Sequence, residues 1–73
     1  MSKAQKELLI KKLKATATIY GFTKEDLAVV LGVHRKTIHD WFRGSLGTLP
    51  TVVRAHRVKT FLLMVDTISN SRI

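Results

Sequence analysis

The chain has 73 residues, enough for a single domain, residues 1–73, with a thin hydrophobic core. It contains no cysteine, and this excludes a disulfide scaffold, a thiolate metal site and a cysteine nucleophile. Lys and Arg number 13 against 5 Asp and Glu, so the formal net charge is +8. A positive field of this size favours a polyanionic partner, nucleic acid ahead of an anionic membrane, over a basic surface that is merely solvated.

The N-terminal segment is typical of an amphipathic helix over residues 3–20. Ser2 followed by Gln5 has the spacing of a capping box at its start, and Gly21 suits its end. The β-branched run within 15–20 makes a strand the competing assignment, but the helical spacing of apolar residues continues through it. The apolar residues at this spacing are Leu9, Ile10, Leu13, Ala17 and Tyr20.

Two short helices are predicted next, over residues 24–31 and 35–43, with a tight turn at Gly32 between them. Thr23 and Asp26 repeat the capping-box pattern at the start of the first helix. A glycine suits the turn because it adopts positive φ without a Cβ penalty. The pattern therefore predicts two helices that cross at a wide angle.

The inward side of the 35–43 helix is set by Ile38 and Trp41, which face Ala28 and Leu31 at the crossing. Because a helix turns by about 100° per residue, its opposite side points outward and carries mostly basic side chains. Such a surface fits the DNA major groove, where Arg and Lys match the paired acceptors of guanine and Asp accepts from cytosine. The predicted base-contacting residues are His34, Arg35, Lys36, His39, Asp40 and Arg43.

Phosphate contacts are expected around this surface. The N-terminus of the 24–31 helix offers free backbone N–H groups and a positive dipole end, both suited to an anion. Most of the excess positive charge lies in residues 1–22 and 45–73, so these flanks supply the general attraction to DNA. For Arg54 and Arg57, a phosphate contact and a solvated position fit equally well. The predicted phosphate-contacting residues are Thr23, Lys24, Thr37, Ser45, Thr48, Arg54 and Arg57.

The apolar and glycine positions of this central segment also have the spacing of a known family. They are Leu27, Ala28, Leu31, Gly32, Val33, Ile38 and Trp41. The flanks Gly21-Phe22-Thr23 and Arg43-Gly44 look similar too, and together these residues resemble the lambda-repressor and Cro-like helix-turn-helix regulators. The resemblance implies a small helical domain that binds operator DNA as a dimer, commonly as a phage or bacterial repressor. It also implies base contacts at the positions of His34, Arg35, Lys36 and Asp40.

The C-terminal segment is predicted to form one long helix over residues 50–68, or two abutting helices, with Pro50 in the first turn. Residues 61–65 are apolar on nearly every side of a helix. We expect a two-fold dimer interface here, because such patches usually mark association. The alternative is a helix central to a single core. His56 is expected to pack near the apolar side. The predicted interface residues are Phe61, Leu62, Leu63, Met64, Val65 and Ile68.

The predicted fold is an all-α, compact domain of four to five helices, with a central helix-turn-helix and a long C-terminal helix. No secretory signal or bilayer-spanning apolar run is visible, so we expect a cytoplasmic, nucleoid-associated protein. The three histidines lack metal-ligand spacing, and no nucleophile, paired-carboxylate or phosphate-loop pattern occurs. We therefore expect no metal, no cofactor, no small-molecule ligand and no catalytic activity.

The leading functional hypothesis is a transcriptional regulator, a repressor, that inserts the 35–43 helix into the major groove of a near-palindromic operator as a homodimer. One alternative is a protein-interaction module, such as an antitoxin or anti-repressor, working through its apolar C-terminal helix. Another is a nonspecific architectural DNA binder. The salt dependence and sequence preference of DNA binding separate the three.

Overall fold

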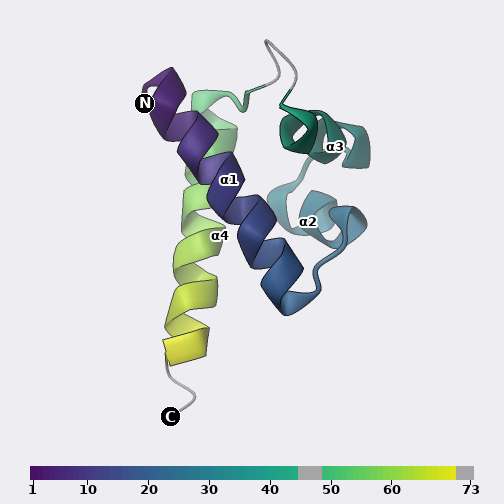
Figure 1. The fold of residues 1–73 in the computed structure, drawn as a ribbon, viewed down its shortest axis with the longest axis vertical. Helices are drawn as coiled ribbons and strands as arrows, with labels where there is room; N and C mark the ends of the chain where they lie inside the picture. Colours follow the sequence, from purple (N-terminus) through teal and green to yellow (C-terminus); the bar gives the residue numbers. More distant parts are fainter. Residues whose placement is uncertain (45–48, 71–73) are drawn as a thin grey trace.

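The computed structural model describes residues 1–44 and 49–70, which form four helices and no strand (Figure 1). This confirms the predicted all-α fold class, and the first three helices have the predicted bounds. None of the helices in these described ranges combines the length and apolar content needed to cross a membrane. The helices are α1 (Lys3–Tyr20), α2 (Lys24–Leu31), α3 (Arg35–Arg43) and α4 (Val52–Asn70).

α1 begins with the predicted capping box. The Ser2 hydroxyl accepts from the Gln5 backbone N–H at 3.2 Å, and the Gln5 side-chain oxygen accepts from the Ser2 N–H at 2.8 Å. The β-branched run near the end of α1 is helical, as predicted, and the Thr18 hydroxyl donates back to the carbonyl of Lys14. Gly21 then ends the helix with a φ of 74°.

α4 begins two residues later than predicted, at Val52. Its cap is Thr51, whose hydroxyl accepts from the Arg54 N–H at 3.3 Å and whose carbonyl accepts from the Ala55 N–H at 2.8 Å. Pro50 precedes the cap and is buried, so the prediction that it lies in the first helical turn was wrong. From Val52 the helix continues unbroken to its last residue, which settles the choice between one long helix and two abutting ones.

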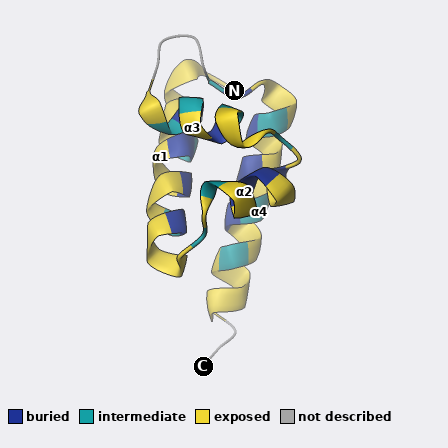
Figure 2. Ribbon diagram, turned by 90° about the vertical axis from the view of Figure 1, so that its right-hand side faces the viewer, coloured by how far each residue is buried: buried dark blue, intermediate teal, exposed yellow. Residues whose placement is uncertain are grey.

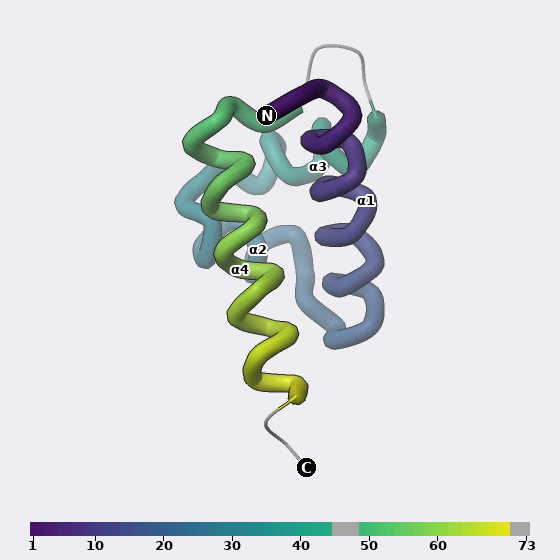
Figure 3. Tube along the Cα trace, turned by 90° about the vertical axis from the view of Figure 1, so that its left-hand side faces the viewer, coloured from purple at the N-terminus to yellow at the C-terminus, as the bar shows by residue number. Residues whose placement is uncertain are grey.

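α1 and α4 form a long pair, and α2 and α3 lie together against one side of it (Figure 1). The two long helices run side by side in the same direction, as Figure 3 shows. At the surface, Lys12 Nζ lies 3.8 Å from a carboxylate oxygen of Asp66. An exposed ion pair of this kind contributes little to stability, so the pairing of α1 with α4 depends on apolar burial.

The core lies where the four helices meet, and buried residues face it from each of them (Figure 2). Leu13 of α1, Ile38 of α3 and Val58 of α4 are completely buried. Full burial of such a side chain is worth about 1.5–3 kcal/mol, so these contacts fix α3 against the long pair. The other buried apolar residues of this cluster are Ile10, Ala17, Leu27, Ala28, Leu31, Trp41 and Leu62.

Tyr20 differs from the other residues predicted on the apolar side of α1, because it is exposed. Its ring stacks on Phe22 with 6.0 Å between ring centroids, and Phe22 meets Phe61 of α4 edge-on at 5.7 Å. The Tyr20 hydroxyl also hydrogen-bonds to the hydroxyl of Ser69. This aromatic row links the end of α1 to α4 at the edge of the core.

Candidate nucleic-acid interface

Hydrogen bonds fix both ends of α2, and a tight turn after its C-terminus leads into α3. At the start of α2, the Thr23 hydroxyl accepts from the Asp26 N–H at 3.0 Å, and the Asp26 carboxylate accepts from the Thr23 N–H at 2.9 Å. At the end of α2, Gly32 has a φ of 67°, in the left-handed region that favours glycine. The Val33 N–H then donates to the carbonyl of Ala28 at 3.0 Å. The turn thus holds α3 in a fixed position relative to α2.

The capping box also affects the charge at the start of α2. The backbone N–H of Thr23 donates to the Asp26 carboxylate and holds its pKa below the ordinary value of 3.8, and the Thr23 side chain adds to this effect. Both hydrogen bonds favour the ionised carboxylate. A negative charge in the first turn also suits the helix dipole, so the N-terminus of α2 is well anchored.

α3 has one face in the core and one in solvent. Ile38 is completely buried and Trp41 is buried beside it, as the sequence predicts. His34 caps α3 without a side-chain cap hydrogen bond, and its side chain is exposed. Asp40 differs from the expectation that it points outward, because it is half-buried. The remaining predicted base-contacting residues are all exposed: Arg35, Lys36, His39 and Arg43.

A contact between α2 and α3 organises this exposed face. Nζ of Lys24 lies 3.1 Å from Nδ1 of His39. A lysine ammonium group can only donate, so Nδ1 accepts and the neutral His39 ring carries its proton on Nε2. The ring therefore offers an N–H donor on its other side. Lys24 and His39 line a shallow hollow together with Arg35 and Lys36.

Arg35 has an acidic neighbour at the edge of this hollow. Its Nε lies 3.9 Å from a carboxylate oxygen of Glu25, and both side chains are mostly exposed. Ion pairs in such a position are worth about 0–1 kcal/mol. Arg35 can therefore exchange this carboxylate for a phosphate or a base edge at little cost in free energy.

The predicted phosphate-contacting residues at the start of α2 lie beside the α3 surface. Thr23 and Lys24 line a second hollow with Glu25 and Arg35. Thr37 of α3 is half-buried. Ser45 and Thr48 fall outside the described residues. The structure thus brings Lys24 into the predicted reading surface itself, which the sequence alone did not indicate because Lys24 and His39 are distant in the chain.

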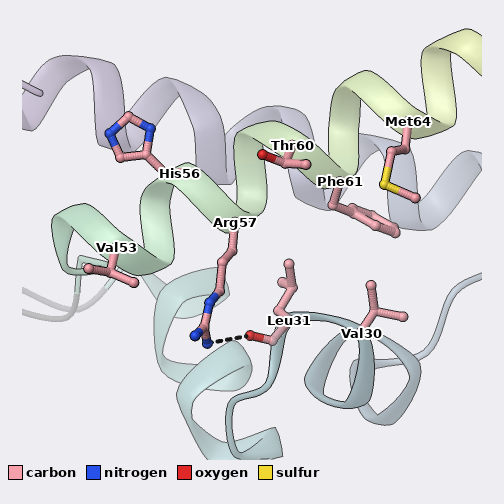
Figure 4. Close-up of a pocket in the computed structure, with 8 residues that line it drawn as sticks. All are labelled: Val30, Leu31, Val53, His56, Arg57, Thr60, Phe61 and Met64. Carbon is pink, nitrogen blue, oxygen red and sulfur yellow. Dashed lines mark hydrogen bonds between the residues drawn. The ribbon is translucent and has the colours of Figure 1, made fainter.

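The two arginines of α4 have separate positions. Arg54 is half-buried near the helix start. The guanidinium Nη1 of Arg57 donates to the carbonyl of Leu31 at 3.4 Å, at the C-terminus of α2 (Figure 4). This bond satisfies a carbonyl that the end of the helix leaves open. Arg57 therefore has a partner within the chain, which the sequence did not predict.

The six residues predicted at a dimer interface fall on different sides of α4. Leu62 is only 4% exposed and belongs to the chain's own core, so its assignment to an interface was wrong. Phe61 and Val65 are half-buried. Leu62 is buried because helical periodicity places position 62 on the same side of α4 as Val58, and this side faces the shared core. The three that stay exposed are Leu63 (58%), Met64 (57%) and Ile68 (59%).

His56 is also exposed, so the expectation that it packs near the apolar side of its helix was wrong. Ala55 and Val58 occupy the inward side there and are completely buried, which turns His56 outward. Within the described residues there is no group of three or more His, Cys, Asp or Glu side chains that could hold a metal ion.

No family model, no curated protein and no solved structure matches the chain. The geometry of α2 and α3 and the charges that they present are therefore the basis for assigning a function.

Proposed function

We propose that this protein is a sequence-specific DNA-binding regulator of transcription, most simply a repressor. It inserts α3 into the major groove of a near-palindromic operator as a homodimer, and it acts in the cytoplasm at the nucleoid without a catalytic role. One observation carries the proposal: α3 is anchored by Ile38 in the core, while Lys24 and His39 join α2 and α3 into one exposed, donor-rich surface.

The exposed side chains of α3 suit base recognition. The major groove is about 12 Å wide and admits a helix about 10–12 Å in diameter. Lys36 and Arg43 present cations that match the O6 and N7 acceptors of guanine. The Nε2–H group of His39 is a further donor for a purine N7. We therefore expect G·C pairs in each half-site.

The start of α2 suits the DNA backbone. The ammonium group of Lys24, the first residue of the helix, lies beside α3 and can bind a phosphate that flanks the bases being read. Arg35 can give up its ion pair with Glu25 and bind a phosphate of the same DNA strand. The net charge of +8 adds a general, salt-dependent attraction along the duplex. Phosphate binding and base recognition are thus assigned to neighbouring residues of one surface.

Selection from a pool of random DNA duplexes tests the proposal. The wild-type protein should enrich one motif with two related halves, centred about 34 Å apart, or one turn of duplex. A variant that removes the α3 cations, Lys36→Ala with Arg43→Ala, should enrich no motif while its circular dichroism stays that of the wild type. If the wild-type protein enriches no motif, the proposal is wrong.

A second candidate function has its own observation. Leu63 and Met64 are large apolar side chains that α4 leaves exposed, as a protein-interaction module would. Absence of DNA binding at moderate salt would favour that function. Equal, salt-sensitive binding to every sequence would instead favour a nonspecific architectural binder.

A further inference from the structure

The outer face of α4 carries a stripe without Lys, Arg, Asp or Glu. Its members recur every three or four residues, so they share one side of the helix, and all of them are exposed. The hydroxyl of Thr67, the last member, donates to the carbonyl of Leu63 within the same helix. The hydroxyl of Thr67 is thereby satisfied, and its methyl group can contact a partner. The stripe consists of Val53, His56, Thr60, Met64 and Thr67.

The charged residue nearest to the stripe is directed away from it. Arg57 extends toward α2 and donates to the Leu31 carbonyl, as Figure 4 shows. Val30 of α2 lies on the same side and lines a hollow with Val53, Thr60 and Met64. This surface therefore exposes the apolar side chains of Val30, Val53 and Met64, with the polar side chains of His56 and Thr60 between them and Arg57 also lining the hollow.

We infer that this stripe is the surface through which two copies of the chain pair, with their α4 helices antiparallel. The inference rests on the homodimer of the proposed function and names its contact surface. Two copies with a charge of +8 each repel one another wherever their basic faces meet. The outer face of α4 is where they can approach with little repulsion and bury Val53 and Met64, which are 63% and 57% exposed in the single chain.

The order of residues along the stripe suits a two-fold axis at Thr60. A two-fold contact uses the same patch on both copies, so each residue meets its counterpart on the other side of the axis. With Thr60 on the axis, Val53 packs against Thr67 of the second copy, and His56 packs against Met64. The small Thr60 lets the two helices approach closely at the centre. The longer side chains on either side then fill the space around the crossing.

The same axis is compatible with DNA binding. Figure 4 shows α1 on one flank of α4 and the α2–α3 pair on the other. An axis that lies in the contact plane, perpendicular to α4, runs from one flank to the other. Both copies of α3 then lie on the same side of the dimer, as binding to one face of a duplex requires.

Single-cysteine variants test the pairing without DNA. The chain has no cysteine, so Thr60→Cys carries one thiol, which the two-fold axis places opposite its counterpart within reach of a disulfide. Ile19→Cys, at an exposed position of α1, is the matched control. Under mild oxidation, Thr60→Cys should form disulfide-linked dimers at least about tenfold faster than the control, because the close approach at the axis is specific. Equal rates in the two variants would overturn the inference.

Sedimentation equilibrium provides an independent test with the same positions. The wild-type mass should rise from 8.3 kDa toward twice that value as concentration increases. Thr60→Glu should remain at the monomer mass and Ile19→Glu should behave as the wild type. Each glutamate lowers the net charge and weakens general repulsion, so only a specific contact explains a loss of dimer at position 60. A wild-type mass that stays at 8.3 kDa, or a dimer unaffected by Thr60→Glu, would overturn the inference whatever the outcome of DNA selection.

Discussion

Nζ of Lys24 lies 3.1 Å from Nδ1 of His39, and this contact joins the first residue of α2 to the exposed face of α3. The lysine thereby holds the neutral imidazole as the tautomer that carries its proton on Nε2, and it keeps a cation at the positive end of the α2 dipole. Under the proposed function, a side chain in this position contributes to both phosphate binding and base reading. The contact is therefore the most informative point at which to perturb the proposed interface.

Lys24→Ala should weaken DNA binding in two ways. Affinity should fall for all sequences, with the slope of log K against log salt reduced by about 1, because one phosphate contact is lost. Preference at the base pair read by His39 should also fall, because the ring loses its fixed tautomer. Fluorescence anisotropy at several salt concentrations measures both effects. His39→Ala should lose the base preference but keep the salt slope, and Lys14→Ala, at an exposed site on α1, should do neither.

Lys36→Ala should reduce discrimination at a single base position by about 1–3 kcal/mol, as the loss of a base contact does. The measurement is a competition series in which each base pair of the selected site is changed in turn. The variant should tolerate changes at one position that the wild-type protein rejects. An equal loss of affinity on every sequence would instead assign Lys36 to a phosphate.

Ile38→Val should lower the free energy of unfolding by about 0.5–1.5 kcal/mol, because it removes one methylene from a completely buried site. Val29→Ala, at a position 83% exposed on α2, should change it by less than about 0.5 kcal/mol. Urea denaturation followed by circular dichroism measures both. If the two variants lost equal stability, the assignment of the inward side of α3 would be wrong.

Gly32→Ala should cost more stability than Gly21→Ala. Both glycines have positive φ, so each alanine carries a backbone cost of about 1 kcal/mol. A Cβ at Gly32 would also lie 3.2 Å from Nη1 of Arg57, while a Cβ at Gly21 meets nothing within 4 Å. In an Arg57→Met background the two costs should become equal. Thermal or urea unfolding of the two alanine variants in both backgrounds checks this. A cost of Gly32→Ala that is the same with Arg57 and with Met at position 57 would contradict it.

Acid should remove the contribution of Asp26 to stability. Its folded-state pKa is lowered, so the ionised carboxylate stabilises the fold above its ordinary pKa of 3.8, and this contribution is lost as pH falls through the folded-state value. Asp26→Asn should therefore be less stable than the wild type at pH 7, and the difference should shrink on acidification below about pH 4. Urea unfolding of both proteins across this range measures it. A difference that stays constant with pH would contradict the role given to the charge.

The bounds of α1, α2 and α3 could be predicted because their ends are encoded locally. Capping boxes at Ser2 and Thr23, and glycines after each helix, act through hydrogen bonds between neighbours in the chain. The start of α4 was predicted wrongly because a proline is tolerated in a first helical turn, whereas here Pro50 precedes the cap that Thr51 forms. The inward side of α3 followed from the spacing of Ile38 and Trp41, since an amphipathic helix has only one apolar face.

Other parts of the site could not be predicted from local pattern. The contact of Lys24 with His39 and that of Arg57 with Leu31 join helices that meet only in the folded chain. Within 61–65 every side of the helix is apolar, so periodicity did not separate the core residue Leu62 from exposed Leu63. Packing of α4 against α1 and α2 decides which of these side chains is buried.

The central claim is that α3 reads DNA sequence, and the ratio of dissociation constants for the selected duplex and a scrambled duplex tests it most directly. Both constants should rise with salt, because both include phosphate contacts. The ratio should remain at about 10³ or more throughout, as base-specific contacts require. A ratio near 1 at every salt concentration, with the protein folded, would contradict the claim.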